Sequence, residues 1–191
     1  MFSNAGITGK PIFSILDVDY DTIKNVLDVN VVGAFFCAKH AARVMIPIKK
    51  GVIVFTASMV TASYGNSPHP YVASKNALLG LTKNVGVELA NYGIRVNCVS
   101  PYAIATPMSL NAFGNMLDRQ TAEKIFAEGG TLKGALLDEE EVAKAVLYLT
   151  SDDSKYVSGL NLILDGGYTT TNMALTEAFK KVFSPTSHQL M

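Results

Sequence analysis

The sequence predicts an α/β fold in which helices pack on a parallel β-sheet. Stretches with helical apolar periodicity alternate with short apolar runs along the 191 residues, a pattern typical of strands joined by helices. Residues Val52 to Phe55 are apolar at every position, as expected of a central parallel strand that is buried on both faces. Because 49% of the residues are apolar, a chain of this length can enclose a hydrophobic core.

The first half of the chain contains two long expected helices. Apolar residues at helical spacing predict a helix from Asp19 to Ile46, and Pro47 ends it. A second helix starts at residues 67–70, because proline is tolerated in a first turn, and it ends at residues 91–93. The strands expected around these helices are residues 2–3, 52–55 and 94–99.

The second half of the chain is less regular. Residues 102–134 are long for a loop in a compact domain, so we expect one or two short helices that form a lid or a binding element. Asp138 is placed to cap the next helix, with Glu141 completing a capping box. A last strand is expected at residues 160–164, and residues 171–191 form a tail with a short helix at 174–183.

Composition excludes several classes of protein. The formal net charge is zero, which argues against an electrostatic nucleic-acid binder. The two cysteines do not make a disulfide framework and are expected to be buried free thiols in a reducing compartment. The N-terminus has no basic leader or hydrophobic segment, and no apolar run reaches the roughly 20 residues of a membrane span. We therefore expect a cytoplasmic protein that binds neither membrane nor nucleic acid.

The acidic run from Asp138 to Glu141 has two interpretations. A metal site is the less favoured one, because carboxylates at a helix start are stabilised by the helix dipole. No metal is therefore expected.

Tyr71 and Lys75 form a candidate acid–base pair. They lie four residues apart at the start of a helix, so their side chains share one face. A phenol is a poor base at neutral pH, and a neighbouring ammonium lowers its pKa. Such pairs also arise by chance in helices, and taken alone this one would be interpreted as structural.

Ser58 strengthens the catalytic interpretation. It follows a buried strand, and open α/β sheets bind ligands at the carboxyl ends of their strands. Its hydroxyl is therefore placed to hydrogen-bond a substrate oxygen and hold it against the phenol. The alternative is a simple cap or turn serine.

The order and spacing of these motifs resemble the short-chain dehydrogenase/reductase family. The matching residues run to about Tyr168 and include Asn4-Ala5-Gly6, Asn30, Ser58, Tyr71, Lys75, Pro101 and Asp165-Gly166-Gly167. The resemblance implies a Rossmann-like doubly wound parallel sheet, with residues 1–170 as a partial catalytic domain. It also implies reversible hydride transfer between a nicotinamide cofactor and a secondary alcohol or ketone.

The resemblance also implies roles for individual residues. Tyr71 would be the general acid/base, Lys75 would lower its pKa and bind the nicotinamide ribose, and Ser58 would orient the substrate oxygen. Asn30 would distort its helix and hold a water molecule. The residues placed at the cofactor are Asn4, Ala5, Gly6, Tyr71, Lys75, Pro101, Tyr102, Ile104 and Thr106.

The expected substrate is a small hydrophobic alcohol or ketone. Tyr102 stands where the family usually has glycine, which resembles plant members such as secoisolariciresinol dehydrogenase and isopiperitenol dehydrogenase and implies a terpenoid- or lignan-like alcohol. Residues 108–117 correspond to a substrate lid, or else they simply pack on the core. The residues expected at the substrate are Ser58, Val60, Tyr71, Met108 and Phe113.

The family normally begins with a strand, a Gly-rich turn and two further βα units, none of which precedes Asn4 in this sequence. The resemblance therefore implies that the amides that bind pyrophosphate and the residue that selects NAD or NADP are missing. NAD is favoured by the plant-like resemblance, and NADP remains open. We further expect the strand at Val52 to become an exposed apolar edge that promotes association.

Two functions remain open on the sequence. The first is an NAD(P)-dependent enzyme, which by resemblance is a homodimer or homotetramer joined through the helices that carry Asn30 and Tyr71. The alternative is a catalytically silent fragment that acts as an interaction or oligomerisation protein.

Overall fold

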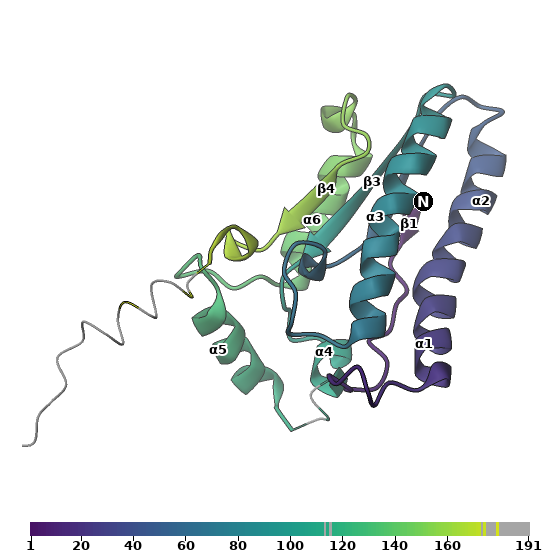
Figure 1. Cartoon of the computed structure of the whole chain (residues 1–191). Helices are drawn as coiled ribbons and strands as arrows, with labels where there is room; N and C mark the ends of the chain where they lie inside the picture. The colour runs from purple at the N-terminus through teal and green to yellow at the C-terminus, as the bar shows by residue number, and fades with distance from the viewer. Residues whose placement is uncertain (113, 115, 173, 175–178, 180–191) are drawn as a thin grey trace, which may run out of the picture.

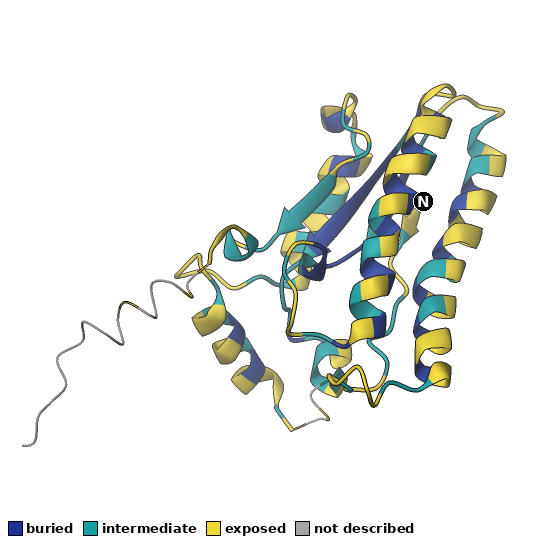
Figure 2. Cartoon of the chain, in the orientation of Figure 1, coloured by how far each residue is buried: buried dark blue, intermediate teal, exposed yellow. Residues whose placement is uncertain are grey.

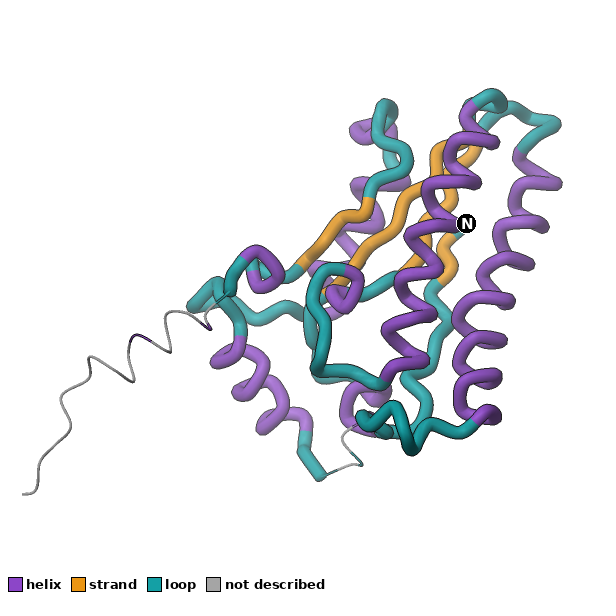
Figure 3. Tube along the Cα trace, viewed as in Figure 1, coloured by secondary structure: helices purple, strands orange, loops and turns teal. Residues whose placement is uncertain are grey.

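The expected α/β architecture is confirmed by the computed structural model, which describes residues 1–112, 114, 116–172, 174 and 179. Four strands form one sheet in the order β1-β2-β3-β4, and every neighbouring pair is parallel (Figures 1 and 3). The strands are β1 (Phe2–Ser3), β2 (Gly51–Thr56), β3 (Ile94–Pro101) and β4 (Asn161–Leu164). The order of the strands in the sheet thus follows their order in the chain.

The strand that contains Val52 is not an exposed edge, so that expectation was wrong. β2 lies between β1 and β3, and its residues Ile53, Val54 and Phe55 are fully buried. Two residues of β1 are enough to pair with the carboxyl half of β2, Phe2 with Val54 and Ser3 with Phe55. The edge strands of the sheet are β1 and β4.

Helices cover both faces of the sheet, as expected of a doubly wound fold (Figure 1). On one face, α2 (Gly33–Met45) and α3 (His69–Ala90) pack their alanines and leucines against Ile53 and Phe55. On the other face, α6 (Glu139–Thr150) packs Leu149 against Val54 and Val99. Successive residues of β2 therefore enter different cores, which explains why its sequence is apolar at every position.

The long helix expected from Asp19 to Ile46 is present, with an irregular centre. It consists of α1 (Tyr20–Leu27), a π-helical turn at Asp28–Val32, and α2. Asp19 caps α1 by accepting a hydrogen bond from the backbone N–H of Thr22 at 2.7 Å. Asp138 caps α6 in the same way, accepting from Glu141 N at 3.0 Å, as the sequence predicted.

The two cysteines differ in burial. Cys98 is buried in β3, as expected, but Cys37 is exposed, so the expectation of two buried thiols was wrong. The buried positions of α2 are Ala34, Ala38 and Ala41, and exposed positions alternate with buried ones along this helix (Figure 2).

The region between β3 and α6 contains the two short helices that were expected, α4 (Pro107–Ala112) and α5 (Arg119–Gly129). Both lie at the end of the sheet where the strands finish (Figure 1). A small core of Ala105, Ala122 and Phe126 joins α5 to the segment after β3. The tail helix expected at 174–183 lies largely outside the described residues, and the domain boundary after residue 170 stays a prediction. None of the described helices is long and apolar enough to cross a membrane.

Candidate active site

The candidate site is a cavity of about 560 Å³ at the carboxyl ends of the strands. Its walls include Asn4 just after β1, the last residues of β2 and β3 (Thr56 and Pro101), and Ser58 and Ile104 in the segments that follow them. Parallel strands that end together at one edge of a sheet bring the residues following them to one place. The cavity therefore lies where the sequence placed the ligand.

Lys75 is a buried cation on the wall of this cavity. Its side chain belongs to the second turn of α3 and is 3% exposed. Nζ donates a hydrogen bond to the carbonyl oxygen of Thr56 at 2.7 Å and lies 5.6 Å from the centroid of the Tyr71 ring. Burial lowers the pKa of Lys75 to about 8, because the charged form is poorly solvated.

Tyr71 and Ser58 also meet at the cavity. A hydrogen bond with Ser58 lowers the pKa of the Tyr71 phenol, but burial is the larger effect and raises that pKa above its ordinary value. The net direction is opposite to the one expected from the sequence, because desolvation outweighs the hydrogen bond with Ser58.

Ser58 is both a turn residue and part of the cavity wall, and its catalytic role stays a prediction. Its Oγ accepts a hydrogen bond from Val60 N at 3.4 Å and so caps the short 3₁₀ turn at Met59–Thr61. The same side chain is buried beside Tyr71 on the wall of the cavity. A turn serine in this position is therefore also available to a ligand.

Asn30 joins the segment after β1 to helix α3. Its Oδ1 accepts from Ile7 N at 2.8 Å, and its Nδ2 donates to Ile7 O and to Ser74 Oγ, both at 2.9 Å. Ser74 Oγ in turn donates to the carbonyl oxygen of Tyr71 at 2.7 Å. The helix distortion expected at Asn30 is present as the π-helical turn at Asp28–Val32. Such turns inside α-helices occur frequently at functional sites.

Gly6 lies against the side chains of Asn30 and Lys75. A Cβ at position 6 would lie 3.3 Å from both Asn30 Oδ1 and Lys75 Nζ, closer than most side-chain contacts. The backbone after β1 therefore lies directly against the amide and the ammonium.

Most residues expected at the cofactor line the cavity, namely Asn4, Tyr71, Lys75, Pro101, Tyr102, Ile104 and Thr106. Ala5 and Gly6 lie outside its lining. Asn4 is held in place by Thr56, whose Oγ1 donates to Asn4 Oδ1 at 2.8 Å.

A nicotinamide cofactor fits these residues. The ammonium of Lys75 has three donors, and among the described residues it uses one of them, so two remain for the hydroxyl oxygens of a ribose. No group of three or more His, Cys, Asp or Glu within the described ranges is arranged to hold a metal ion.

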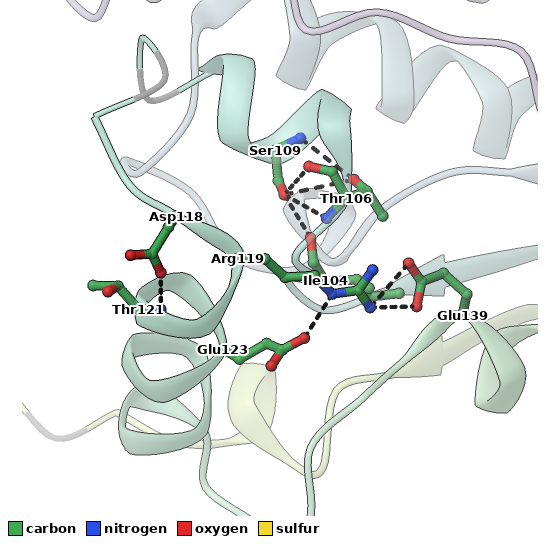
Figure 4. Close-up of polar contacts among 8 residues, drawn as sticks. All are labelled: Ile104, Thr106, Ser109, Asp118, Arg119, Thr121, Glu123 and Glu139. Carbon is green, nitrogen blue, oxygen red and sulfur yellow. Dashed lines mark hydrogen bonds and ion pairs between the residues drawn. The ribbon is translucent and has the colours of Figure 1, made fainter.

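The residues expected at the substrate also converge. Ser58, Val60, Tyr71 and Met108 all line the cavity, whereas Phe113 lies outside the described residues. The turn into α4 is fixed by Ser109, whose Oγ donates to Ile104 O at 2.6 Å and to Thr106 O at 2.9 Å (Figure 4). This turn sets the position of Met108 on the wall.

An ion-pair bridge joins helix α5 to the start of helix α6. Arg119 at the start of α5 contacts Glu123 at 2.8 Å and Glu139 at the start of α6 at 3.3 Å (Figure 4). Glu139 lines the cavity, so this bridge links α5 to its wall.

Sequence reasoning missed several residues of the site, of which Phe13 and Ser74 are the most informative. Phe13 lines the cavity from the loop after β1, and Ser74 is the buried link between Asn30 and Tyr71. No pattern identifies Phe13, because its loop lacks periodicity. The only signal for Ser74 is a polar residue in the apolar stripe of α3.

The chain matches one protein-family model over residues 1–169, described as enoyl-(acyl carrier protein) reductase. It is 51% identical over 190 residues to short chain aldehyde dehydrogenase 1 of Euphorbia lathyris, a match that covers 96% of this chain and 66% of that protein. It is 49% identical to a mitochondrial borneol dehydrogenase of Lavandula x intermedia over 90% of this chain and 62% of the relative. It is 46% identical to secoisolariciresinol dehydrogenase of Forsythia intermedia over 92% of this chain and 63% of the relative.

Two solved structures are similar to this chain in fold. Levodione reductase superimposes with a TM-score of 0.78 at 32% identity, covering 90% of this chain and 66% of the other. ElxO with NADP bound superimposes with a TM-score of 0.77 at 27% identity, covering 89% and 66%. The chain thus spans 62 to 66% of the length of the curated relatives described above. The cavity, the Asn30–Ser58–Tyr71–Lys75 cluster and these matches show that the chain belongs to the short-chain dehydrogenase/reductase family.

Proposed function

We propose that this chain carries the catalytic half of an oxidoreductase that transfers a hydride between a nicotinamide cofactor and a hydrophobic secondary alcohol or ketone. The observation that carries the proposal is the meeting of Ser58, Tyr71 and Lys75 on one cavity wall. The names of the Lavandula and Forsythia relatives support a terpenoid- or lignan-like substrate.

Each side chain has a defined task in this reaction. The Ser58 hydroxyl donates a hydrogen bond to the substrate oxygen and holds it beside the Tyr71 hydroxyl. In ketone reduction, Tyr71 Oη gives its proton to that oxygen, and in alcohol oxidation it takes the proton back. A bound nicotinamide supplies or accepts the hydride. Because burial raises the pKa of Tyr71, the phenol is protonated at neutral pH and is ready to act as the acid.

The remaining residues hold the cofactor and Tyr71. Lys75 would offer its two further donors to the ribose, and Pro101, Ile104 and Thr106 would border the nicotinamide. Asn30 fixes the start of α3 through Ser74 and so positions the Tyr71 backbone. NAD is the proposed cofactor over NADP, following the resemblance to plant members. A cytoplasmic location stays a prediction, and the Lavandula relative is described as mitochondrial.

Calorimetric titration of the folded chain with NAD, and then with NADP, tests the first half of this proposal. Saturable binding in the micromolar range is expected from Lys75 and the cavity. A folded sample that binds neither dinucleotide would contradict the proposal for this chain.

Alcohol oxidation by the chain, tested with borneol, checks the second half. We expect Tyr71→Phe to reduce the rate by about 100-fold or more, because it removes the proton-transfer group while keeping the ring. The NAD affinity of the variant, measured alongside, separates a loss of proton transfer from a loss of cofactor binding. Equal rates for Tyr71→Phe and the wild-type chain would exclude Tyr71 as the acid/base.

A further inference from the structure

A second cavity of about 550 Å³ lies beside the candidate active site. It is formed between the end of β4, the last turn of α5 and the segment that leads into α6. Apolar side chains on its wall include Leu132, Leu136 and Ile163. The proposed reaction does not use this cavity, although its volume is within the range of small-molecule sites.

Two aromatic residues belong to the walls of both cavities. They are Tyr102 and Phe126, and they are the residues common to both linings within the part of the chain that the structure describes. Tyr102 follows β3 directly, and Phe126 belongs to α5. The two cavities therefore adjoin at this pair of rings.

The ring of Tyr102 is held from three sides. Its backbone N–H donates to Leu164 O at 2.9 Å, which fixes its start beside the end of β4. Its ring packs against Tyr168, with centroids 4.9 Å apart and an angle of 43° between the planes. Its hydroxyl reaches α5, where a Cβ on Gly129 would lie 3.1 Å away. The side chain thus extends from the sheet to α5.

We propose that Tyr102 is a partition that limits the length of the alcohol, and that the second cavity is a subsite for the far part of an elongated apolar alcohol once the ring is removed. This inference rests on the proposed function, because it assumes that the reacting alcohol lies in the first cavity. Compact alcohols fit without the second cavity. Rigid alcohols whose second ring extends in line with the first need the second cavity.

Ligand binding to the 191-residue chain tests the partition. The probes are borneol, which is compact, and 4-cyclohexylcyclohexanol, which is elongated and rigid, each titrated by saturation-transfer NMR in the presence of NAD. The variants are Tyr102→Ala and Tyr102→Leu. Leucine keeps apolar contact with Ala105 and Phe126 but is too short to reach Gly129, so it protects against loss of the α5 core. Tyr102→Phe is the control, because it keeps the ring in place.

The expected result is a gain for the elongated alcohol alone. The ratio of its Kd to the Kd of borneol should fall by about tenfold or more in Tyr102→Leu, since an additional ring of the elongated alcohol leaves water. Tyr102→Phe should show no such fall in this ratio, because its ring still separates the two cavities. Thermal unfolding of each variant shows whether the fold is intact.

Two other outcomes are informative in different ways. If borneol binds all variants but the elongated alcohol gains nothing in Tyr102→Leu, or gains as much in Tyr102→Phe, the partition is excluded and the proposed function stands. If borneol binds neither the wild-type chain nor any variant, the first cavity is not an alcohol site, and both proposals are overturned.

Discussion

At the scale of single residues, the buried ammonium of Lys75 is the most consequential group. It has one hydrogen-bond acceptor, Thr56 O, among the described residues, and no carboxylate is among the causes of its pKa shift. An unpaired buried charge destabilises the folded state until a partner or ligand compensates it. The ammonium of Lys75 therefore lowers the stability of the fold and, at the same time, is available to bind oxygen acceptors of a ligand.

Lys75 gives the folding free energy a defined pH dependence. The pKa of Lys75 is about 8 in the folded chain, whereas its ordinary value in water is 10.5. Between pH 8 and pH 10.5 the unfolded chain therefore binds one more proton than the folded chain. Stability then rises with pH, and the contribution of Lys75 should become more favourable by about 3 kcal/mol from pH 7 to pH 10.5. Denaturant unfolding at several pH values measures this.

Lys75→Met is the reference for that measurement, because other lysines and tyrosines also titrate in the range. The difference in unfolding free energy between the two proteins should narrow as pH rises, since methionine carries no charge at any pH. A difference that stays constant from pH 7 to pH 10.5 would show that Lys75 is not destabilised by burial.

The Tyr71–Lys75 pair also shows what the sequence can reveal at this scale. Spacing predicted that both side chains share a face and a site, which the cavity confirms. The direction of the Tyr71 pKa shift could not be predicted, because it depends on how deeply the phenol is buried, and burial arises from residues distant in sequence. Phe13 was missed for the same reason: only the tertiary fold brings its loop to the cavity.

At the scale of elements, the π-helical turn between α1 and α2 is the main irregularity. Periodicity predicted one uninterrupted helix, and the apolar stripe alone gives no sign of the extra residue in the turn. The resemblance to the family located the distortion at Asn30, whose side-chain amide hydrogen-bonds to Ile7 and Ser74. For strand β1 the resemblance misled the prediction. It suggested that β2 would be an exposed edge, but the two residues of β1 pair with β2.

Asn30→Leu should destabilise the fold by at least about 2 kcal/mol, because it leaves the backbone groups of Ile7 and the Ser74 hydroxyl with fewer partners in a buried place. Urea unfolding followed by circular dichroism measures the change. Asn25→Leu is the matched control, since Asn25 lies in α1 and is exposed. Equal effects of the two substitutions would show that the hydrogen bonds of Asn30 contribute nothing to stability.

At the scale of the whole molecule, an apolar stripe lies on the outer surface of the helical layer. Val32 is 43% exposed and Phe36 is 54% exposed, and they are four residues apart along the helix, so they share one face. Phe35 lies next to them and is also exposed. Large exposed apolar side chains that cluster in this way mark interaction surfaces. This position favours the homo-oligomer expected through the helices that carry Asn30 and Tyr71.

Phe36→Glu should therefore weaken self-association, because it places a charge in the apolar contact. Sedimentation velocity should show a dimer or larger species for the wild-type chain and a shift to monomer, with at least about tenfold weaker association, for the variant. Ile125→Glu on α5 introduces the same charge at an exposed apolar residue away from the stripe and should leave the assembly unchanged. A wild-type chain that sediments as a monomer at all concentrations would contradict this assignment.

The close approach of Tyr102 to Gly129 has a consequence for the evolutionary record. A Cβ at position 129 would lie 3.1 Å from the tyrosine hydroxyl, so a side chain there requires the Tyr102 ring to shift, and the two positions are coupled. A lineage that gains a bulky residue at 129 has to shorten or move residue 102, and a lineage with glycine at 102 is released from the constraint. We therefore expect these two positions, 27 residues apart in the chain, to covary among relatives.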